Sequence, residues 1–163
     1  MQTAKQQFLD QFKAEHAITM KVLGAFPKDQ GEFRPHPRSQ SARELAWTFV
    51  VEQSIISQAL KGPLDFSGGF PKPLDDFQKV INQFDSDFRN LVPQIEQAPD
   101  ARFDETVKFF TGPGQMSDIP IIQLSWFMLC DQIHHRGQYS VYVRMAGGKV
   151  PAIYGPSADE PWS

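Results

Sequence analysis

Four stretches of the chain repeat apolar residues at the three- and four-residue spacing of an amphipathic helix, and polar, proline-rich stretches separate them. The pattern predicts helices over residues 4–26, 41–62, 74–97 and 118–146. No internal repeat or change of composition marks a second domain. The sequence therefore predicts one all-α domain over residues 1–163, built as a four-helix bundle.

The second helix has the sharpest signals at its ends. Ser41 and Glu44 have the spacing of a capping box, in which each side chain bonds to the backbone N–H of the other residue. Gly62-Pro63 ends the helix. Residues 62–73 then hold three Gly and three Pro, in a connection longer than the usual link between bundle helices. We expect this connection to carry the chain across the end of the bundle before the third helix.

The region before the last helix is harder to assign. Its β-branched and aromatic content, followed by a Gly-Pro-Gly turn, favours a short extended segment or an irregular loop over residues 98–116. Ser117 is the predicted N-cap of the helix over 118–146, and Gly147-Gly148 ends it. Because that helix is apolar on most sides, we expect it at the centre of the bundle. The tail, residues 149–163, is expected to pack as an ordered loop.

Amino-acid composition and charge exclude several classes of protein. Sixteen Lys and Arg against 19 Asp and Glu give a net charge of −3, without the basic patch that nucleic-acid binding requires. The single cysteine, Cys130, excludes an internal disulfide and fits a reducing compartment. The N-terminus has no signal-peptide pattern, and no apolar run approaches the ~18 residues of a membrane helix. We therefore predict a cytoplasmic protein that binds neither nucleic acid nor membrane.

The candidate chemistry lies on the last helix. Asp131 and His135 are four residues apart, so both project from one face that is otherwise apolar. A carboxylate there needs a partner, which is a divalent metal, a hydrogen-bonded imidazole or solvent in a cleft. Gln138 is placed to hydrogen-bond His135. On the second helix, Thr48 and Glu52 are also four residues apart and would point at this pair if the two helices face each other.

Each of these residues also has a purely structural explanation. Glu52 would be a salt-bridged carboxylate paired with Arg136 or Arg144, and Thr48 would bond to the carbonyl one turn before it. Asp131 and His135 would form a local polar pair, which is more common on helices than a metal site. The remaining candidates have structural explanations of their own. His16 is expected to be a partly exposed side chain and His36 a solvated loop residue, while His134 is expected to be structural or interfacial and Cys130 a buried, inert thiol.

Two blocks of sequence resemble a known family. Ser41-Ala42-Arg43-Glu44-Leu45-Ala46-Trp47-Thr48, and later His134-His135-Arg136-Gly137-Gln138 leading to Gly147-Gly148-Lys149-Val150-Pro151 and Tyr154-Gly155, are similar to the DinB/YfiT-like superfamily. The resemblance implies a four-helix bundle with a long crossover between helices two and three, which often assembles as a homodimer. It also implies a metal centre of three histidines, and relatives that include thiol-dependent transferases, an isomerase and a metal-dependent hydrolase.

Carried over residue by residue, the resemblance places the three metal ligands at Thr48, Asp131 and His135, of which only His135 is a histidine. The first hypothesis is a DinB-like protein with a pocket at these residues, between the second and the last helix. If it is an enzyme, it is a metal-dependent transferase or hydrolase that acts on a small thiol or other small substrate. His135 would be its base or metal ligand, and Asp131 would orient His135 or share the metal. The second hypothesis is a metal-free ligand-binding or dimerisation protein, in which Asp131 and His135 form a buried hydrogen-bonded pair.

Overall fold

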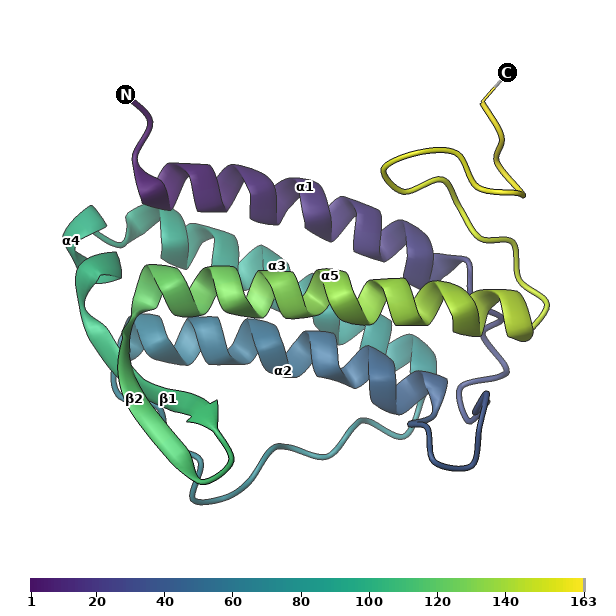
Figure 1. The fold of residues 1–163 in the computed structure, drawn as a ribbon, viewed down its shortest axis with the longest axis horizontal. Helices are drawn as coiled ribbons and strands as arrows, with labels where there is room; N and C mark the ends of the chain where they lie inside the picture. The colour runs from purple at the N-terminus through teal and green to yellow at the C-terminus, as the bar shows by residue number, and fades with distance from the viewer. Residues whose placement is uncertain (163) are drawn as a thin grey trace.

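The computed structural model describes residues 1–162, and the chain is mostly helical. Its long helices are α1 (Ala4–Gly24), α2 (Ala42–Lys61), α3 (Phe77–Gln97) and α5 (Ile121–Met145). These four lie side by side along the long axis of the molecule (Figure 1). One end carries the short helix α4 (Asp100–Asp104) and a hairpin of β1 (Thr106–Gly112) and β2 (Gln115–Pro120).

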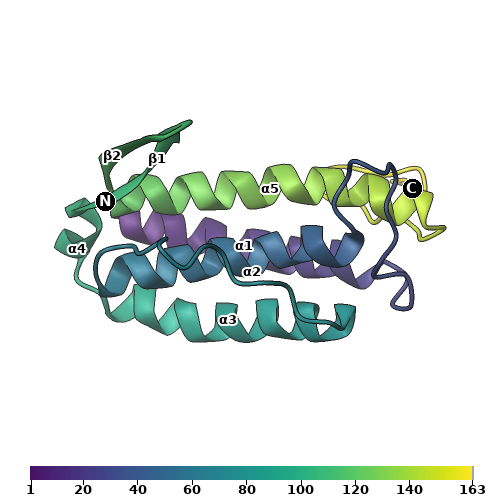
Figure 2. The same cartoon turned by 90° about the horizontal axis from the view of Figure 1, so that it is seen from below.

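The order of the helices follows from the connection between α2 and α3. Figures 1 and 2 show the segment after α2 running back along the length of the molecule, so that α2 and α3 point in the same direction. α2 packs between α3 and α5, and α1 closes the arrangement by packing on α5 and α3. Each long helix therefore buries one broad face and leaves another open to solvent or to a covering segment.

The signals at the ends of two helices are confirmed. The backbone N–H of Glu44 donates to Ser41 Oγ over 3.2 Å, and the backbone N–H of Ser41 donates to Glu44 Oε2 over 2.8 Å. The last helix stops where the two glycines predict it. Gly147 has a φ of 83°, in the left-handed region that disfavours side chains, and a Cβ on Gly148 would lie 2.6 Å from the carbonyl oxygen of Ala25.

The hairpin changes the start of α5. Residues predicted as the first turn of the helix pair instead with β1, in a register that sets Val107 opposite Ile119. Ser117 is therefore a strand residue and not an N-cap, because α5 begins only at Ile121. The predicted extended segment is confirmed for β1, in which the alternate residues Val107 and Phe109 are buried.

The expectation that α5 lies at the centre of the bundle is wrong. Phe127 and Val141 on this helix are each 55% exposed, and Met145 is 53% exposed. α5 is one wall among four, since its main contacts are with α1 and α2. Its apolar residues on the outer face are therefore left open or covered only by the hairpin. Among residues 1–162, no helix has the length and hydropathy of a membrane span.

A polar layer crosses the middle of the core and separates two apolar clusters. One cluster, around Phe12, lies toward the hairpin end, and the other, around Phe49, lies toward the end where α5 stops. Between them the buried polar side chains come from α1, α2 and α5, and they are Glu15, His16, Thr19, Glu52, Gln53, Gln132 and Arg136. Because an unpaired charge in an apolar interior is costly, the charged members of this layer need partners.

Arg136 is the most extensively bonded member of the layer. Its side chain is 2% exposed, and Nη1 donates to Glu15 Oε2 over 2.6 Å and to Thr19 Oγ1 over 3.3 Å. Nη2 donates to the hydroxyl of Tyr154, which in turn donates to Glu15 Oε2 over 2.7 Å. The network ties the C-terminal tail to α1 and α5, so the tail is ordered through the Tyr154 hydroxyl as well as through partly buried Val150 and Ile153.

His16 is also a full member of the polar layer and not a partly exposed side chain. It is 6% exposed, its ring stacks on Phe88 at 3.7 Å between centroids, and Nε2 lies 3.2 Å from Asp85 Oδ1. Burial lowers the pKa of His16, and the nearby Asp85 opposes that shift. The ring is therefore neutral in the folded protein at neutral pH.

We predict that Arg136→Met lowers the free energy of unfolding by about 3–5 kcal/mol, because it leaves Glu15 buried without its counter-charge. Urea denaturation measures the change. Lys13→Met is the matched control, since the Lys13–Glu96 pair is exposed, and it should lose less than about 1 kcal/mol. The double variant Arg136→Met/Glu15→Gln should recover part of the loss. Equal losses in Arg136→Met and Lys13→Met would contradict the importance of the buried network.

Candidate functional site

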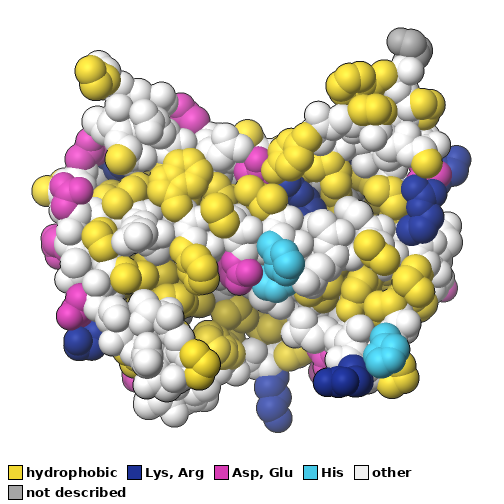
Figure 3. All heavy atoms as spheres, in the orientation of Figure 1, with side chains coloured by type: hydrophobic (Ala, Val, Ile, Leu, Met, Phe, Trp, Pro, Cys, Tyr) yellow, Lys and Arg dark blue, Asp and Glu magenta, His cyan; other side chains and the backbone are white. Residues whose placement is uncertain are grey.

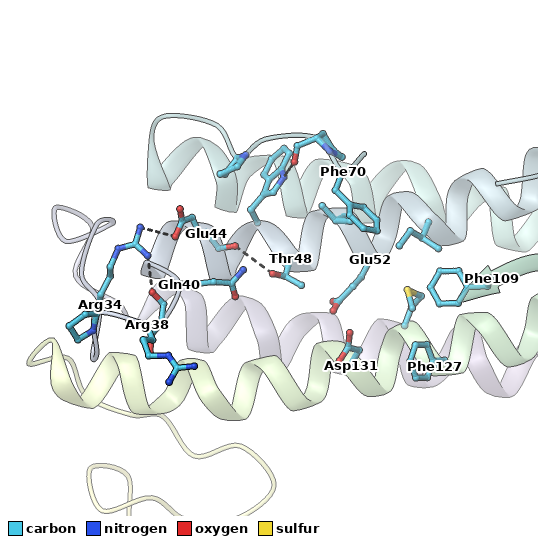
Figure 4. Close-up of a pocket in the computed structure, with 18 residues that line it drawn as sticks. Arg34, Arg38, Gln40, Glu44, Thr48, Glu52, Phe70, Phe109, Phe127 and Asp131 are labelled. Carbon is cyan, nitrogen blue, oxygen red and sulfur yellow. Dashed lines mark hydrogen bonds and ion pairs between the residues drawn. The ribbon is translucent and has the colours of Figure 1, made fainter. Parts of the chain in front are cut away.

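A cleft of about 710 Å³ opens on the polar layer from the side of α2 and α5. α2 and α5 form its floor, and the loop residues 34 and 37–40, residues 70–73 of the connection, and Phe109 of the hairpin form its rim. Figure 3 shows an acidic side chain next to a histidine near the middle of a face that is otherwise largely hydrophobic or uncharged. Figure 4 shows Glu52 and Asp131 pointing toward each other from the two helices.

Three potential metal ligands meet beside this cleft, and two of them, Glu52 and Asp131, line it. Glu52 comes from α2, and Asp131 and His135 come from α5. Each offers one ligand atom, and the three atoms lie within 4.8 Å of one another. His135 Nδ1 lies 3.0 Å from Glu52 Oε1 and 3.9 Å from Asp131 Oδ1. The i, i+4 spacing on α5 and the facing position on α2 thus produce a cluster of two carboxylates and one imidazole.

Burial sets the charge states in this cluster. The Glu52 side chain is 4% exposed, and burial followed by the negative charge of Asp131 raises the pKa of Glu52 well above its usual range. Burial lowers the pKa of His135, and Asp131 opposes that shift. In the absence of a cation, Glu52 therefore holds a proton to a higher pH than a free glutamate, and His135 stays neutral to a lower pH than a free histidine.

Glu52 is incompletely satisfied. Its Oε1 contacts His135, but its Oε2 is buried and has no hydrogen-bond partner among residues 1–162. An unmade hydrogen bond at a buried oxygen costs about 1–3 kcal/mol. The protein keeps this oxygen beside Asp131 at the floor of the cleft, where a bound proton or cation would satisfy it.

The structure brings Asp131 and His135 together with Glu52, and Thr48 lies one turn earlier on α2 in the same cleft. The Thr48 hydroxyl points back to the carbonyl of Glu44 at 3.5 Å, as its structural explanation expects. Its role as a metal ligand stays a prediction. The side chain in contact with His135 from α2 is Glu52.

Three expected pairings are wrong. Glu52 pairs with neither Arg136 nor Arg144, because Arg136 binds Glu15 and Arg144 binds Asp159. Asp131 and His135 do not form a buried hydrogen bond, since 3.9 Å separates them and the Asp131 side chain is 39% exposed.

The expected hydrogen bond between Gln138 and His135 is the third pairing that is wrong. The Gln138 side-chain amide lies 2.8 Å from Nε2 of His134 instead. His134 is exposed, as is His36, which accepts a hydrogen bond from the backbone N–H of Arg38. Both histidines therefore lie outside the cluster, as expected. The expectation that Cys130 is buried is wrong, since its side chain is exposed on α5.

Comparison with known proteins agrees with the fold. The model of the DinB family matches residues 1–162. The uncharacterised protein YrdA of Bacillus subtilis is 27% identical over 160 residues, which span 94% of this chain and 89% of that protein.

Two solved structures are similar in fold. A DinB-like protein of Bacillus cereus matches with a TM-score of 0.74 at 20% identity, covering 90% of this chain and 95% of that one. The DinB-like protein YjoA of Bacillus subtilis matches with a TM-score of 0.69 at 19% identity, covering 88% and 93%.

We predict that Glu52→Gln makes the metal-free protein more stable than wild type by an amount that grows with pH. The pKa of Glu52 is raised in the folded state, so wild type loses stability as pH rises above about 4.5, the pKa of the unfolded chain, until the raised pKa is passed. The difference in the free energy of unfolding should grow by up to about 1.4 kcal/mol per pH unit in that window.

Urea denaturation in chelator between pH 5 and 8 measures this difference. Glu96→Gln, on the exposed surface of α3, controls for the chemical change itself. A Glu52→Gln difference that stays constant over this range would contradict the protonated state of the buried carboxyl group.

Proposed function

The chain belongs to the DinB family, and we propose that it is a metal-dependent enzyme whose centre is Glu52, Asp131 and His135. The reaction is a hydrolysis or a transfer to a small thiol, carried out on a small molecule bound in the cleft between α2 and α5. The observation that carries the proposal is the convergence of these three side chains, two of which line the cleft, with one buried Glu52 oxygen left without a partner among residues 1–162.

The donor set fits a divalent cation. Two carboxylates and one imidazole are common ligands of Mn²⁺, Fe²⁺ and Zn²⁺. Glu52 Oε2 has no partner among residues 1–162, and a dication that displaced the proton of Glu52 would neutralise both Glu52 and Asp131. A site with more oxygen ligands than the three-histidine pattern favours the harder cations, so we propose Mn²⁺ or Fe²⁺ before Zn²⁺ or Ni²⁺.

The protein side chains have separate tasks in this proposal. Glu52 is buried on α2 and is the innermost of the three ligands. Asp131 is 39% exposed and faces the open side of the cleft, where a substrate would enter. The lowered pKa of His135 keeps its ring neutral and able to accept a proton or a ligand. A bound cation would supply a Lewis acid beside the reacting bond.

A second candidate is a metal-free protein that binds a small molecule in the same cleft. The departure from three histidines at Thr48 and Asp131 favours it, because the neutral Thr48 hydroxyl is a poor ligand. In this case Glu52 remains protonated and Asp131 carries the charge, which leaves a polar spot on the floor of an otherwise apolar cleft.

We predict that Mn²⁺ or Fe²⁺ binds wild type at about one ion per chain and raises its thermal midpoint. At a concentration of one hundred times the dissociation constant the stabilisation is about 2.7 kcal/mol. His135→Ala and Glu52→Gln should lose both the bound metal and the rise. His134→Ala is the matched control on the neighbouring exposed histidine, and it should keep both.

Activity assays on the same samples separate the two reaction classes. Hydrolysis of p-nitrophenyl butyrate supports a hydrolase, and conjugation of cysteine to 1-chloro-2,4-dinitrobenzene supports a thiol transferase. Either activity should depend on added metal and be lost in His135→Ala. The metal proposal is wrong if wild type holds no Mn²⁺, Fe²⁺, Zn²⁺ or Ni²⁺ above background after loading.

We also propose that the protein is a homodimer in solution, as the family resemblance implies. Exposed apolar side chains on the outer face of α5, including Val141 and Met145, are consistent with a contact surface there. Light scattering after size-exclusion chromatography should give twice the chain mass of 18.5 kDa. A single-chain mass at micromolar concentration would contradict the dimer.

A further inference from the structure

The cleft has chemically different ends on either side of Glu52 and Asp131. In Figure 4, Arg34, Arg38, Gln40 and Glu44 lie on one side, and Phe109 and Phe127 lie on the other. The same cleft is lined at its apolar end by Phe70, Met128 and Ile55. An elongated molecule bound across the centre would therefore meet a polar group at one end and an aromatic wall at the other.

Arg38 is the cation available to a ligand at the polar end. The neighbouring Arg34 is already engaged, since Nη2 pairs with Glu44 Oε2 at 2.9 Å and Nη1 donates to the carbonyl of Ser39 at 2.8 Å. The guanidinium of Arg38 also lines the cleft, but no carboxylate of residues 1–162 lies within 4.0 Å of it. A free guanidinium presents paired N–H donors that match the geometry of a carboxylate.

Ring contacts of Phe109 hold the aromatic end in place. Phe109 packs against Phe66 with ring centroids 5.9 Å apart and against Phe127 at 6.1 Å, which fixes the hairpin to the connection and to α5. Phe127 and Phe70 remain 55% and 57% exposed at the cleft wall. Partly exposed aromatic faces arranged around one hollow are typical of a surface that a ligand covers.

The charges in the cleft set the charge of the ligand. The Arg34–Glu44 pair is neutral, and a dication between Glu52 and Asp131 neutralises both carboxylates. The positive charge of Arg38 is then left over, so the loaded cleft matches a molecule with one negative charge. This step rests on the proposed metal centre, because the empty cluster would repel an anion.

We propose that the substrate of this cleft is a small monocarboxylate with an apolar or aromatic body. The carboxylate binds Arg38, the body lies against Phe70, Phe109 and Phe127, and the reacting group lies over Glu52, Asp131 and His135. Arg38 and Phe127 are then specificity-determining residues on opposite sides of the metal centre.

Isothermal titration calorimetry of the Mn²⁺-loaded protein with 4-phenylbutyrate and its neutral analogue 4-phenylbutan-1-ol tests this assignment. Wild type should bind 4-phenylbutyrate about tenfold or more tightly than the alcohol, since a hydrogen bond to a charged group contributes about 1.5–3 kcal/mol. Arg38→Gln should remove that preference and leave the affinity for the alcohol unchanged. Phe127→Ala should weaken both ligands to a similar degree.

Two control substitutions outside the cleft test whether the changes in ligand affinity are specific to Arg38 and Phe127. Arg89→Gln changes an exposed arginine on α3, and Met116→Ala changes an apolar residue of β2 that is 46% exposed and lies outside the cleft lining. Both should bind like wild type. Equal affinity of wild type for the two ligands, or a preference that survives Arg38→Gln, would overturn the proposal.

Metal content measured on the same samples separates this inference from the proposed function. Bound Mn²⁺ without any preference for the carboxylate means that the metal centre stands and the ligand assignment fails. A preference that depends on Arg38 in protein that holds no metal means that the carboxylate subsite stands and the metal-dependent function fails. A preference seen only with bound Mn²⁺ supports both.

Discussion

The constraint on which the rest of this structure depends is the polar layer through the middle of the helical core. Charged side chains from α1, α2 and α5 are buried between two apolar clusters, where an unpaired charge would destabilise the fold by several kcal/mol. Arg136 and Glu15 resolve this on one side with an ion pair that also recruits the Tyr154 hydroxyl. That arrangement fixes the rotation of α5 about its own axis, since Arg136 has to face α1. His135, the preceding residue, is thereby directed away from α1 and toward α2, where it meets Glu52.

The two sides of the layer differ in how completely they are satisfied. The buried oxygens and nitrogens around Arg136 are bonded within the protein, whereas Glu52 keeps one oxygen without a partner among residues 1–162. Glu52 is not alone in this, since His16 Nδ1, both amide atoms of Gln53 and Gln132 Nε2 also lack a partner among residues 1–162. Glu52 is the one of these four residues that lines the cleft. The cleft opens over this unsatisfied side. The same packing that makes the Arg136 side structural therefore makes the Glu52 side available for chemistry.

The walls of the cleft come from segments that contribute little to the helical core. The hairpin and the connection between α2 and α3 are fastened to each other by Phe66, Phe109 and Phe110, whose ring centroids lie between 4.9 and 5.9 Å apart. Such segments can change in sequence without disturbing the helices that carry Glu52, Asp131 and His135. The rim of the cleft and its floor can therefore vary independently of each other.

The sequence alone determined the features that depend on neighbours along the chain. The Ser41–Glu44 capping box, the stop at Gly147 and the i, i+4 placement of Asp131 and His135 all follow from local backbone geometry. The two blocks of residues that carry the family resemblance are likewise visible without a structure. Only the tertiary structure decided which side chain faces His135 from α2, because the rotation of one helix against another depends on packing over the whole bundle. It also decided that Arg136 binds Glu15 rather than Glu52, and that residues 115–120 pair as a strand instead of starting α5. Those outcomes depend on contacts between residues that are far apart in the chain, and the local sequence pattern holds no information about such contacts.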